Sequence, residues 1–545
     1  MSRAQCARLL TPLFVLAALP ACSNTPASGG TSAARAPTLV VITAGGTALG
    51  DGATDVPPTL DLHLTADVAL KQSNAGAQLD GSTLSLRADG DGLSAAVAPM
   101  QLGSAHTLVV SIAGRPDAHI GFRVVSAGQA FAAVHVEQGP GTVLDLALSL
   151  PPKNQQDVVA ALPLGGAPIW VDPRHLRATW ATPPSGTFHL RAGIPLDRGT
   201  TLGDALDLAL RPAPRPGTLT IASPPASPQL PAHPIVVAFS VPTATSRESV
   251  AAHIAQISVL SPSGLTAGAD GSLRGDPDDA AVASARVAGV PIWPLVQNAG
   301  FDAPAVHALL TNAAAQEHLV GALRAAAAAG GWGGVHLDLE NVAETDRDAL
   351  SALVRDLAVG LHADGRRLAV AAVPHRPGHE NAINAAFDLA AIGRAADLVT
   401  LMAYEQHSAS TDPGPVAGLQ WDSQILDGSA TAVGDPARTL LGMPLYARTW
   451  GQGGQDSADS YASAVSDALQ QAGGARVDYD FTQGTPLIAP ARGGLPITYF
   501  DDATSLARKL ALAGARHLVG IAVWRLGFED PRFWSLLPAK ATPPA

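Results

Sequence analysis

Short runs of alternating apolar and polar residues fill the first part of the chain. Between residues 37 and 127 such runs, for example 60–65 and 106–111, are separated at close intervals by turn residues such as the Asp-Gly-Asp-Gly of 89–92. Successive side chains of a strand point to opposite faces, so a period of two with frequent turns is typical of antiparallel sheets. The pattern predicts an all-β sandwich domain over residues 37–127.

A second β region follows, from residue 128 to residue 212, with strand-like runs such as 142–150. Prolines then crowd residues 213–232, which predicts a stiff linker. Residues 51–58 are similar to the start of bacterial Ig-like modules, so the sandwich over 37–127 is expected to be Ig-like. Neither β region carries a catalytic combination of residues, and we expect a spacer or an accessory binding surface.

After residue 233 the pattern changes to strands that alternate with helices. Eight such units over about 300 residues are typical of a (β/α)8 TIM barrel, here residues 233–540, whose chemistry lies at the C-terminal ends of the strands. The chain is therefore predicted to be multidomain. The candidate strands are 234–240, 257–260, 290–298, 334–340, 368–374, 398–404, 439–448 and 519–527, and candidate helices are 304–329, 347–362, 383–395 and 503–513.

The N-terminus has the layout of a secretory signal. Residues 1–21 begin with two arginines, continue with a short apolar run and end on a small residue before Cys22. The arrangement resembles the bacterial lipoprotein signal, in which the cysteine is lipidated, and ordinary signal cleavage nearby is the alternative. Cys6 lies inside the signal, so the exported chain would keep Cys22 alone and form no internal disulfide. Residues 22–36 predict a flexible tether, and we expect a membrane-anchored lipoprotein of the periplasm, outer envelope or cell surface.

Composition and charge limit the classes of molecule that the protein can bind. The chain has 545 residues, a 47% hydrophobic fraction and a net charge of −12. Without a cluster of Lys and Arg, this charge excludes nucleic acid as a partner, because a phosphate backbone requires a basic footprint. His375, His379 and His407 lack a spacing that would favour a metal site. We expect no cofactor, no metal and a monomeric protein.

The candidate strand 334–340 carries the chemistry. It reads Gly-Val-His-Leu-Asp-Leu-Glu, so His336, Asp338 and Glu340 share one face and are expected to point into the barrel. Neighbours on that face are about 6.6 Å apart, which lets the two carboxyl groups share a proton. Two carboxylates in a partly desolvated mouth titrate in coupled steps, and one remains protonated near neutral pH. Such an acid is what a leaving-group oxygen needs.

This strand resembles the fourth-strand motif Asp-x-x-Asp-x-Asp-x-Glu of the family 18 glycoside hydrolases. It is most similar to the Gly-Val-Asn-Ile-Asp-Phe-Glu-Asn branch of spore-cortex N-acetylglucosaminidases, with Glu340 and Asp338 matching and Gly333 and His336 departing. Further matches follow in order: 402–405 with Met-x-Tyr-Asp, 412–417 and Trp421 with Pro-Gly-Pro-Val-Ala…Trp, 441–450 with the seventh-strand Gly-x-Pro-x-Tyr-Gly-Arg-x-Trp, and 520–527 with the eighth strand.

The resemblance implies a retaining, substrate-assisted hydrolysis, in which the acetamido oxygen of the sugar is the nucleophile. By this resemblance Glu340 is the general acid and base, Asp338 holds the acetamido N–H, and Tyr404 donates to the acetamido oxygen. Further residues are expected to bind substrate: Trp524 as an apolar floor, Glu405, Tyr446, Arg448 and Trp293.

Three functions remain open at this point. The first is hydrolysis of β-1,4-linked N-acetylglucosaminides of peptidoglycan or chitin type. The second is a chitinase-like lipoprotein that binds carbohydrate without cleaving it, and the third is a structural envelope lipoprotein. Sugar-binding relatives of this kind usually lack the acid, and Glu340 is present, which favours the hydrolase. Only 4% of residues are aromatic, which disfavours processive action on crystalline chitin.

Overall fold

The computed structural model describes residues 39–43, 48–136, 141–181, 184–210, 219–222, 234–378, 381–451, 456–471 and 473–539. The chain divides after Val125 into two compact units. The predicted signal 1–21, the predicted tether 22–36 with its expected lipidation site Cys22, and His379 lie outside the described residues. Within those ranges, none of the helices has the combination of length and apolarity that crossing a membrane requires.

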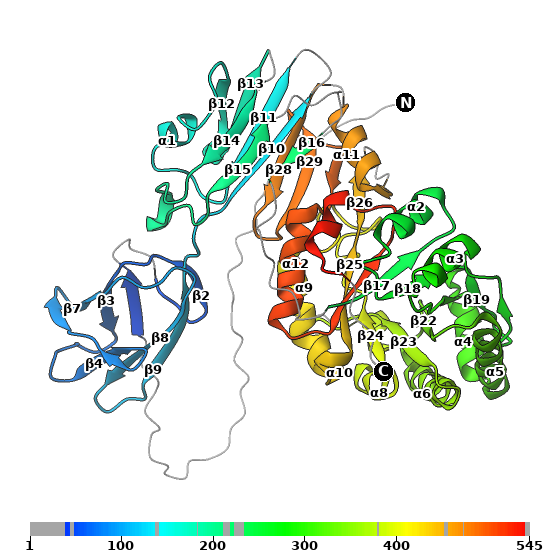
Figure 1. The fold of residues 1–545 in the computed structure, drawn as a ribbon. Coiled ribbons are helices and arrows are strands. Elements are labelled where there is room, and N and C mark those ends of the chain that lie inside the picture. Colours follow the sequence, from blue (N-terminus) through cyan, green and yellow to red (C-terminus); the bar gives the residue numbers. More distant parts are fainter. Residues whose placement is uncertain are drawn as a thin grey trace, which may run out of the picture. The chain divides into compact units, whose positions relative to one another are not determined.

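The first unit contains two β-sheets (Figure 1, blue). One has the strand order β1-β3-β7-β6 and the other β2-β9-β8-β4-β5. Strand β3 shows the predicted alternation, since Leu60, Leu62 and Leu64 are buried while Asp61 is exposed. The strands are β1 Leu39–Thr43, β2 Ala53–Val56, β3 Leu60–Ala66, β4 Ala75–Leu79, β5 Ser82–Thr83, β6 Arg87–Asp89, β7 Gly92–Val97, β8 Ala105–Ile112 and β9 Ala118–Val124.

The second unit begins with another β region. A five-stranded sheet has the order β12-β13-β11-β10-β16, and β14 and β15 form a hairpin beside it. Strand β16 lies inside the stretch 213–232 that was expected to be a linker, and Ala133 of β10 pairs with its Ile221. The elements are β10 Ala130–Val136, β11 Thr142–Leu148, α1 Gln155–Val159, β12 Ala167–Asp172, β13 His175–Trp180, β14 Gly186–Leu190, β15 Leu206–Leu210 and β16 Leu219–Ile221.

A TIM-barrel-type fold makes up most of the second unit. Its eight parallel strands correspond to the eight predicted ones, and neighbouring strands pair in parallel in the order β18-β17-β31-β25-β24-β23-β22-β21. A parallel bridge between Leu260 and Ile292 joins the two ends of this row. The strands are β17 Ile235–Ser240, β18 Val259–Pro262, β21 Leu295–Asn298, β22 Gly334–Asp338, β23 Arg367–Ala372, β24 Leu398–Leu401, β25 Thr439–Pro444 and β31 Gly520–Trp524, with β19 Leu265–Ala267 and β20 Leu273–Arg274 added beyond β21.

Alternate residues of the barrel strands pack inward and outward. Phe239, Leu295 and Ala369 belong to the inner cluster, whereas Val335 and Leu337 pack with residues of the surrounding helices. These helices include α2 Ala244–His253, α3 Asp279–Val287, α4 Ala303–Thr311, α5 Ala313–Gly330, α6 Arg347–Ala363, α7 Ala382–Ala385, α8 Leu389–Ala395, α9 Leu419–Ile425, α10 Thr431–Val433 and α12 Ala503–Ala515.

Two predicted helices are divided by caps. The expected helix 304–329 is two helices, because the side chain of Asn312 accepts hydrogen bonds from the N–H groups of Ala314 and Ala315 and starts α5 anew. Likewise Asp388 accepts from Ala391 N–H and separates α8 from α7. Local side-chain capping therefore overrides an otherwise continuous helical pattern.

An inserted sheet follows β25. The expected strand 439–448 is in fact two strands, because the chain leaves the barrel at Leu445 and continues as β26. The sheet has the order β27-β26-β30-β29-β28. Its elements are β26 Tyr446–Trp450, β27 Asp456–Ser460, α11 Tyr461–Leu469, β28 Ala475–Asp480, β29 Thr485–Pro490 and β30 Ile497–Tyr499.

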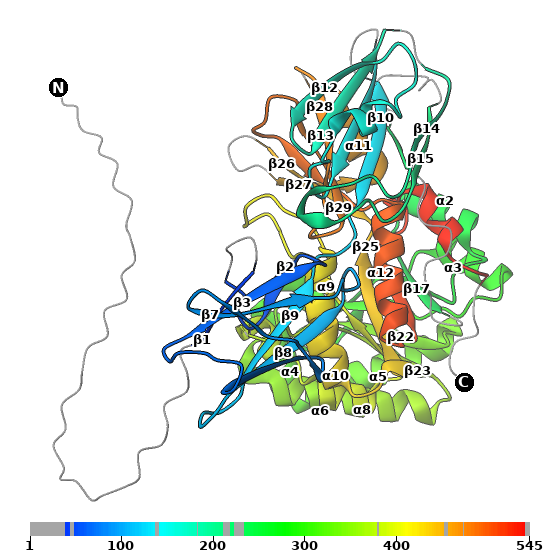
Figure 2. The same ribbon diagram turned by 90° about the vertical axis from the view of Figure 1, so that its left-hand side faces the viewer.

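The second β region packs directly against this inserted sheet (Figure 2). Phe131 stacks on Tyr479 with ring centroids 4.8 Å apart. Buried polar contacts join the same surfaces: Val477 N–H donates to Asp145 Oδ2 at 3.0 Å, and His175 lies 2.8 Å from Asp478. A region predicted as a spacer or accessory surface is thus part of one compact unit with the barrel.

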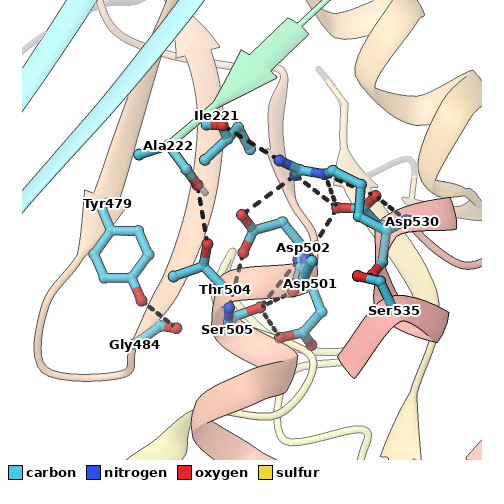
Figure 3. A network of polar contacts seen from close by, with 12 residues as sticks. Ile221, Ala222, Tyr479, Gly484, Asp501, Asp502, Thr504, Ser505, Asp530 and Ser535 are labelled. Atoms are coloured by element: carbon cyan, nitrogen blue, oxygen red, sulfur yellow. Dashed lines mark hydrogen bonds and ion pairs between the residues drawn. The ribbon is translucent and has the colours of Figure 1, made fainter. Parts of the chain in front are cut away.

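A polar network continues this contact at the start of α12 (Figure 3). Arg532 donates to the carbonyl of Ile221 and Thr504 to that of Ala222, each at 3.3 Å. Arg532 also binds Asp530 at 2.7 Å. Residues 221 and 222, in the middle of the proline-rich stretch 213–232, are therefore held by side chains of α12 and of η6 (Pro531–Leu536).

Candidate active site

A cleft of about 390 Å³ opens at the C-terminal ends of β22, β23 and β24. Glu340 and Tyr404 line it, together with side chains from the loops that follow these strands. In a barrel of this type, loops after the strands carry the chemistry. The other lining residues are Val373, Pro374, Arg376, Asn381, Ile383, Asn384, Met402, Glu405, Gln406, Trp421 and Ile425.

Glu340 lies two residues beyond the end of β22 and is fixed through its backbone. Its N–H donates to Asn298 Oδ1 at 2.9 Å, and Asn298 Nδ2 donates to its carbonyl at 3.1 Å. This pair of bonds fixes the main chain and leaves the carboxyl group free to line the cleft. Burial, and secondarily the charge of Glu405, raises the pKa of Glu340.

Asp338 is the last residue of β22 and is almost completely buried. One of its oxygens, Oδ2, accepts a hydrogen bond of 2.9 Å from Gln297 Nε2 at the end of β21. The other, Oδ1, has no partner among the residues that the structure describes. Burial and the charge of Glu340 raise the pKa of Asp338 to about 7, although the Gln297 amide acts in the opposite direction. The two carboxyl groups therefore titrate as an interacting pair.

His336 lies inside the barrel one step below Asp338, and it is fully buried. Its ring is 4.9 Å from that of Phe239, and within the described ranges neither ring nitrogen has a hydrogen-bond partner. Burial lowers the pKa of His336 to about 3, so the ring is neutral at physiological pH. His336 therefore does not supply a positive charge to Asp338. The carboxyl group of Asp338 is instead hydrogen-bonded by the neutral amide of Gln297.

Tyr404 and Glu405 follow β24. Burial and the charges of Asp338, Glu340 and Glu405 raise the pKa of Tyr404, so its hydroxyl keeps its proton and remains a donor. Glu405 has a positive φ of 63°, which is uncommon for this residue type. Its carboxylate accepts from the hydroxyl of Tyr446 and from Arg448 Nη2 at 2.7 Å. The inserted strand β26 thus holds Glu405 at the rim of the cleft.

The two predicted tryptophans lie at different levels of the barrel. Trp524 ends β31, is partly exposed and meets Phe239 edge-on at 5.4 Å between centroids, beside His336. Trp293 is 2% exposed in the inner cluster and packs against Gly334, at the opposite end of β22 from Asp338. Four residues of strand correspond to about 13 Å. Trp524 therefore shares its neighbour Phe239 with His336 but is not among the residues that line the cleft, and Trp293 lies far from the carboxylates.

Three residues of the site were not identified from the sequence. Gln297 and Asn298 are the last two residues of the candidate strand 290–298. This position at the C-terminal end of a barrel strand is the sequence feature that could have marked them as site residues. Arg376 lies in the loop after β23, where no motif marks it. No set of three or more His, Cys, Asp or Glu side chains among the described residues is arranged to hold a metal ion.

Comparisons with known proteins agree with this geometry. Residues 303–529 match the family model of Glycosyl hydrolases family 18. A curated relative named as a sporulation-specific glycosylase of Bacillus subtilis is 30% identical over 246 residues, which cover 44% of this chain and 57% of the relative. A cortical fragment-lytic enzyme of Bacillus anthracis is 25% identical over 49% of this chain and 64% of its own length. The chain thus spans about three fifths of these relatives.

A solved structure adds to these relatives. A chitinase from Chromobacterium violaceum aligns with a TM-score of 0.52 at 28% identity, covering 56% of this chain and 97% of the chitinase. The spore cortex-lytic enzyme of Bacillus megaterium, at 21% identity and a TM-score of 0.51, shows the same fold. Residues 303–529 therefore carry the sequence features of glycosyl hydrolases family 18 on a TIM-barrel-type fold.

Proposed function

We propose that this chain hydrolyses β-1,4-linked N-acetylglucosaminides of peptidoglycan or chitin type with retention of configuration. The observation that carries the proposal is the pair Asp338 and Glu340 at the C-terminal end of β22, two carboxyl groups with raised pKa values, of which Glu340 lines the cleft. The comparisons support a glycoside hydrolase. The signal-like N-terminus supports action at the bacterial envelope through a lipid anchor on Cys22.

Glu340 is assigned the proton transfers. In the first step its carboxyl donates a proton to the glycosidic oxygen while the acetamido oxygen of the same sugar attacks the anomeric carbon. The leaving sugar departs, and the carboxylate of Glu340 then takes a proton from the attacking water. The raised pKa of Glu340 favours the protonated form that the first step requires.

Asp338 and Tyr404 are assigned the acetamido group. The Oδ1 atom of Asp338, which has no partner in the described part of the chain, is available to accept from the acetamido N–H. Its negative charge would stabilise the cyclic oxazolinium ion. The protonated hydroxyl of Tyr404 would donate to the acetamido oxygen and orient it for attack.

The sugar itself would contact the remaining residues. Trp524 offers a partly exposed ring to the apolar face of a sugar, and Glu405 offers carboxylate oxygens to hydroxyl groups. Tyr446 and Arg448 act through Glu405, because both hold its carboxylate. Trp293, deep in the barrel, receives no role in binding.

The substitution Glu340→Gln tests the proposal. We expect cleavage of a chromogenic di-N-acetylchitobioside to fall by about 100-fold or more, since the amide cannot supply the proton. Glu344→Gln is the matched control, because Glu344 is exposed in the following 3-10 turn. Undiminished turnover in Glu340→Gln would contradict the assignment. Wild-type protein that binds chito-oligosaccharides without releasing reducing ends would favour the carbohydrate-binding alternative instead.

A further inference from the structure

Among the described residues that line the cleft beside Glu340, Arg376 is the one cation. The lining carries two further charged residues, Glu340 and Glu405. Glu405 is already paired with Arg448. Arg376 makes no hydrogen bond or ion pair with any residue that the structure describes. Burial and the charge of Glu405 are the causes that raise the pKa of Glu340, so Arg376 is not a counter-charge of that acid.

The backbone on both sides of Arg376 is fixed. His375 N–H donates to Ser429 Oγ at 2.7 Å, and Ser429 Oγ donates back to the His375 carbonyl at 2.7 Å. Pro377 packs against Gly428, where even a β-carbon would come within 2.8 Å of Pro377 Cδ. A residue before proline is also restricted to extended backbone. Arg376 is therefore held in the cleft by its neighbours and not by its own side chain.

An unpaired guanidinium on a fixed backbone in a cleft is suited to an anion. Its planar set of donors matches a carboxylate with two parallel hydrogen bonds, and these charge-assisted bonds are stronger than neutral ones. A neutral N-acetylglucosamine polymer has no group that needs such a cation. Trp421 lines the same cleft and offers an aromatic surface to the sugar that would carry the anion.

Given the hydrolysis proposed above, on which this inference rests, we infer that Arg376 binds a carboxylate carried by the sugar next to the N-acetylglucosaminide that is cleaved. The lactyl ether of N-acetylmuramic acid, in a glycan strand without attached peptide, is a carboxylate of this kind. Arg376 is then a specificity residue that selects peptide-free peptidoglycan strands over chitin oligomers.

Three tetrasaccharides test this inference: an alternating N-acetylglucosamine–N-acetylmuramic acid strand, the same strand with its lactyl carboxylates converted to methylamides, and chitotetraose. For wild type we expect kcat/KM to be about tenfold higher on the carboxylate strand than on its methylamide, and the preference to shrink with added salt. Arg376→Gln should bring the ratio to about one, because kcat/KM falls more on the carboxylate strand than on its methylamide or on chitotetraose. Arg376→Lys should keep part of the preference.

Arg355→Gln is the matched control, because Arg355 is exposed on α6 and pairs only with its neighbour Asp356 among the described residues. A ratio that stays unchanged in Arg376→Gln, or an equal loss on all three substrates, would overturn the inference. A wild type that cleaves all three equally would overturn it and leave the proposed hydrolysis intact. A wild type that cleaves none of them would contradict the proposed function itself. If Arg376→Gln does not fold, the salt dependence of the wild-type ratio and the Lys variant decide.

Discussion

The barrel mouth and the start of α12 both bury carboxylates, but they satisfy them differently. At the mouth, Asp338 has one oxygen bound by Gln297 and the other unpartnered in the described part of the chain. At α12, both oxygens of Asp501 accept from Lys509, at 2.8 and 2.7 Å, and Lys509 is 1% exposed. Burial without a cation raises the pKa of Asp338, whereas Asp501 is buried together with the opposite charge of Lys509.

The position of a buried carboxyl group in the fold decides whether it can take part in catalysis. Asp422, on α9, is also buried, has an unpartnered oxygen within the described ranges, and burial raises its pKa to about 7. Neither acid lines the cleft itself, but Asp338 interacts with Glu340, which does, whereas Lys509 and Asp501 are the charges that act on Asp422. A raised pKa is therefore common to both regions. Position at the C-terminal end of a barrel strand, next to a cavity, separates Asp338 from Asp422.

Removing the charge at the mouth should have the largest effect on activity. We expect Asp338→Asn to lower kcat by about 100-fold to 10,000-fold, because the charge that stabilises the intermediate is lost. Stability should not fall, since the raised pKa of Asp338 means that its ionised form is unfavourable in the folded state. Kinetics and thermal unfolding on the same preparation measure both. A large loss of stability would show that Asp338 is a structural residue.

The reverse result is expected at α12. Lys509→Met leaves Asp501 buried with its charge unpaired, and we expect a loss of about 3–5 kcal/mol of unfolding free energy. The kcat of the protein that remains folded should be nearly unchanged. Denaturant unfolding measures the effect, with Lys153→Met, at an exposed position of the same unit, as the control. Equal unfolding free energies of the two variants would contradict a stabilising role of the buried pair of Asp501 and Lys509.

A smaller change should sharpen the role of the amide at Gln297. Gln297→Leu removes the donor that lowers the pKa of Asp338, so the limb of the pH–rate profile that belongs to Asp338 should move upward by about one unit. The amide N–H donates to the ionised carboxylate and stabilises it, so loss of the amide raises the pKa of Asp338. Gln297→Glu places a second acid at this position and should move the limb further. An unmoved limb in both variants would contradict the assignment.

Much of the barrel was predictable from the sequence because it depends on local periodicity. The eight strand segments follow from apolar runs, and the common face of His336 and Asp338 follows from the two-residue period of a strand. The helix break at Asn312 was not predicted, because the apolar pattern continues through it. The break depends on a single side chain that caps the backbone of α5.

Contacts between distant segments were not predictable from one sequence. Strand β16 was predicted to be linker because the prolines on both sides of it dominate the local pattern, although β10 supplies a pairing partner. The docking of the second β region depends on pairs such as Asp145 with Val477, more than 300 residues apart. Gln297 reaches Asp338 because their strands are neighbours in the barrel, which gives no signal along either strand alone.

The measurement that tests the central claim most directly compares two chromogenic chitobiosides, one natural and one with a hydroxyl in place of the 2-acetamido group on the sugar whose bond is cleaved. If that group is the nucleophile, held by Asp338 and Tyr404 while Glu340 supplies the proton, the hydroxyl analogue should be cleaved at least about a thousandfold more slowly. Cleavage of both substrates at similar rates would contradict the account.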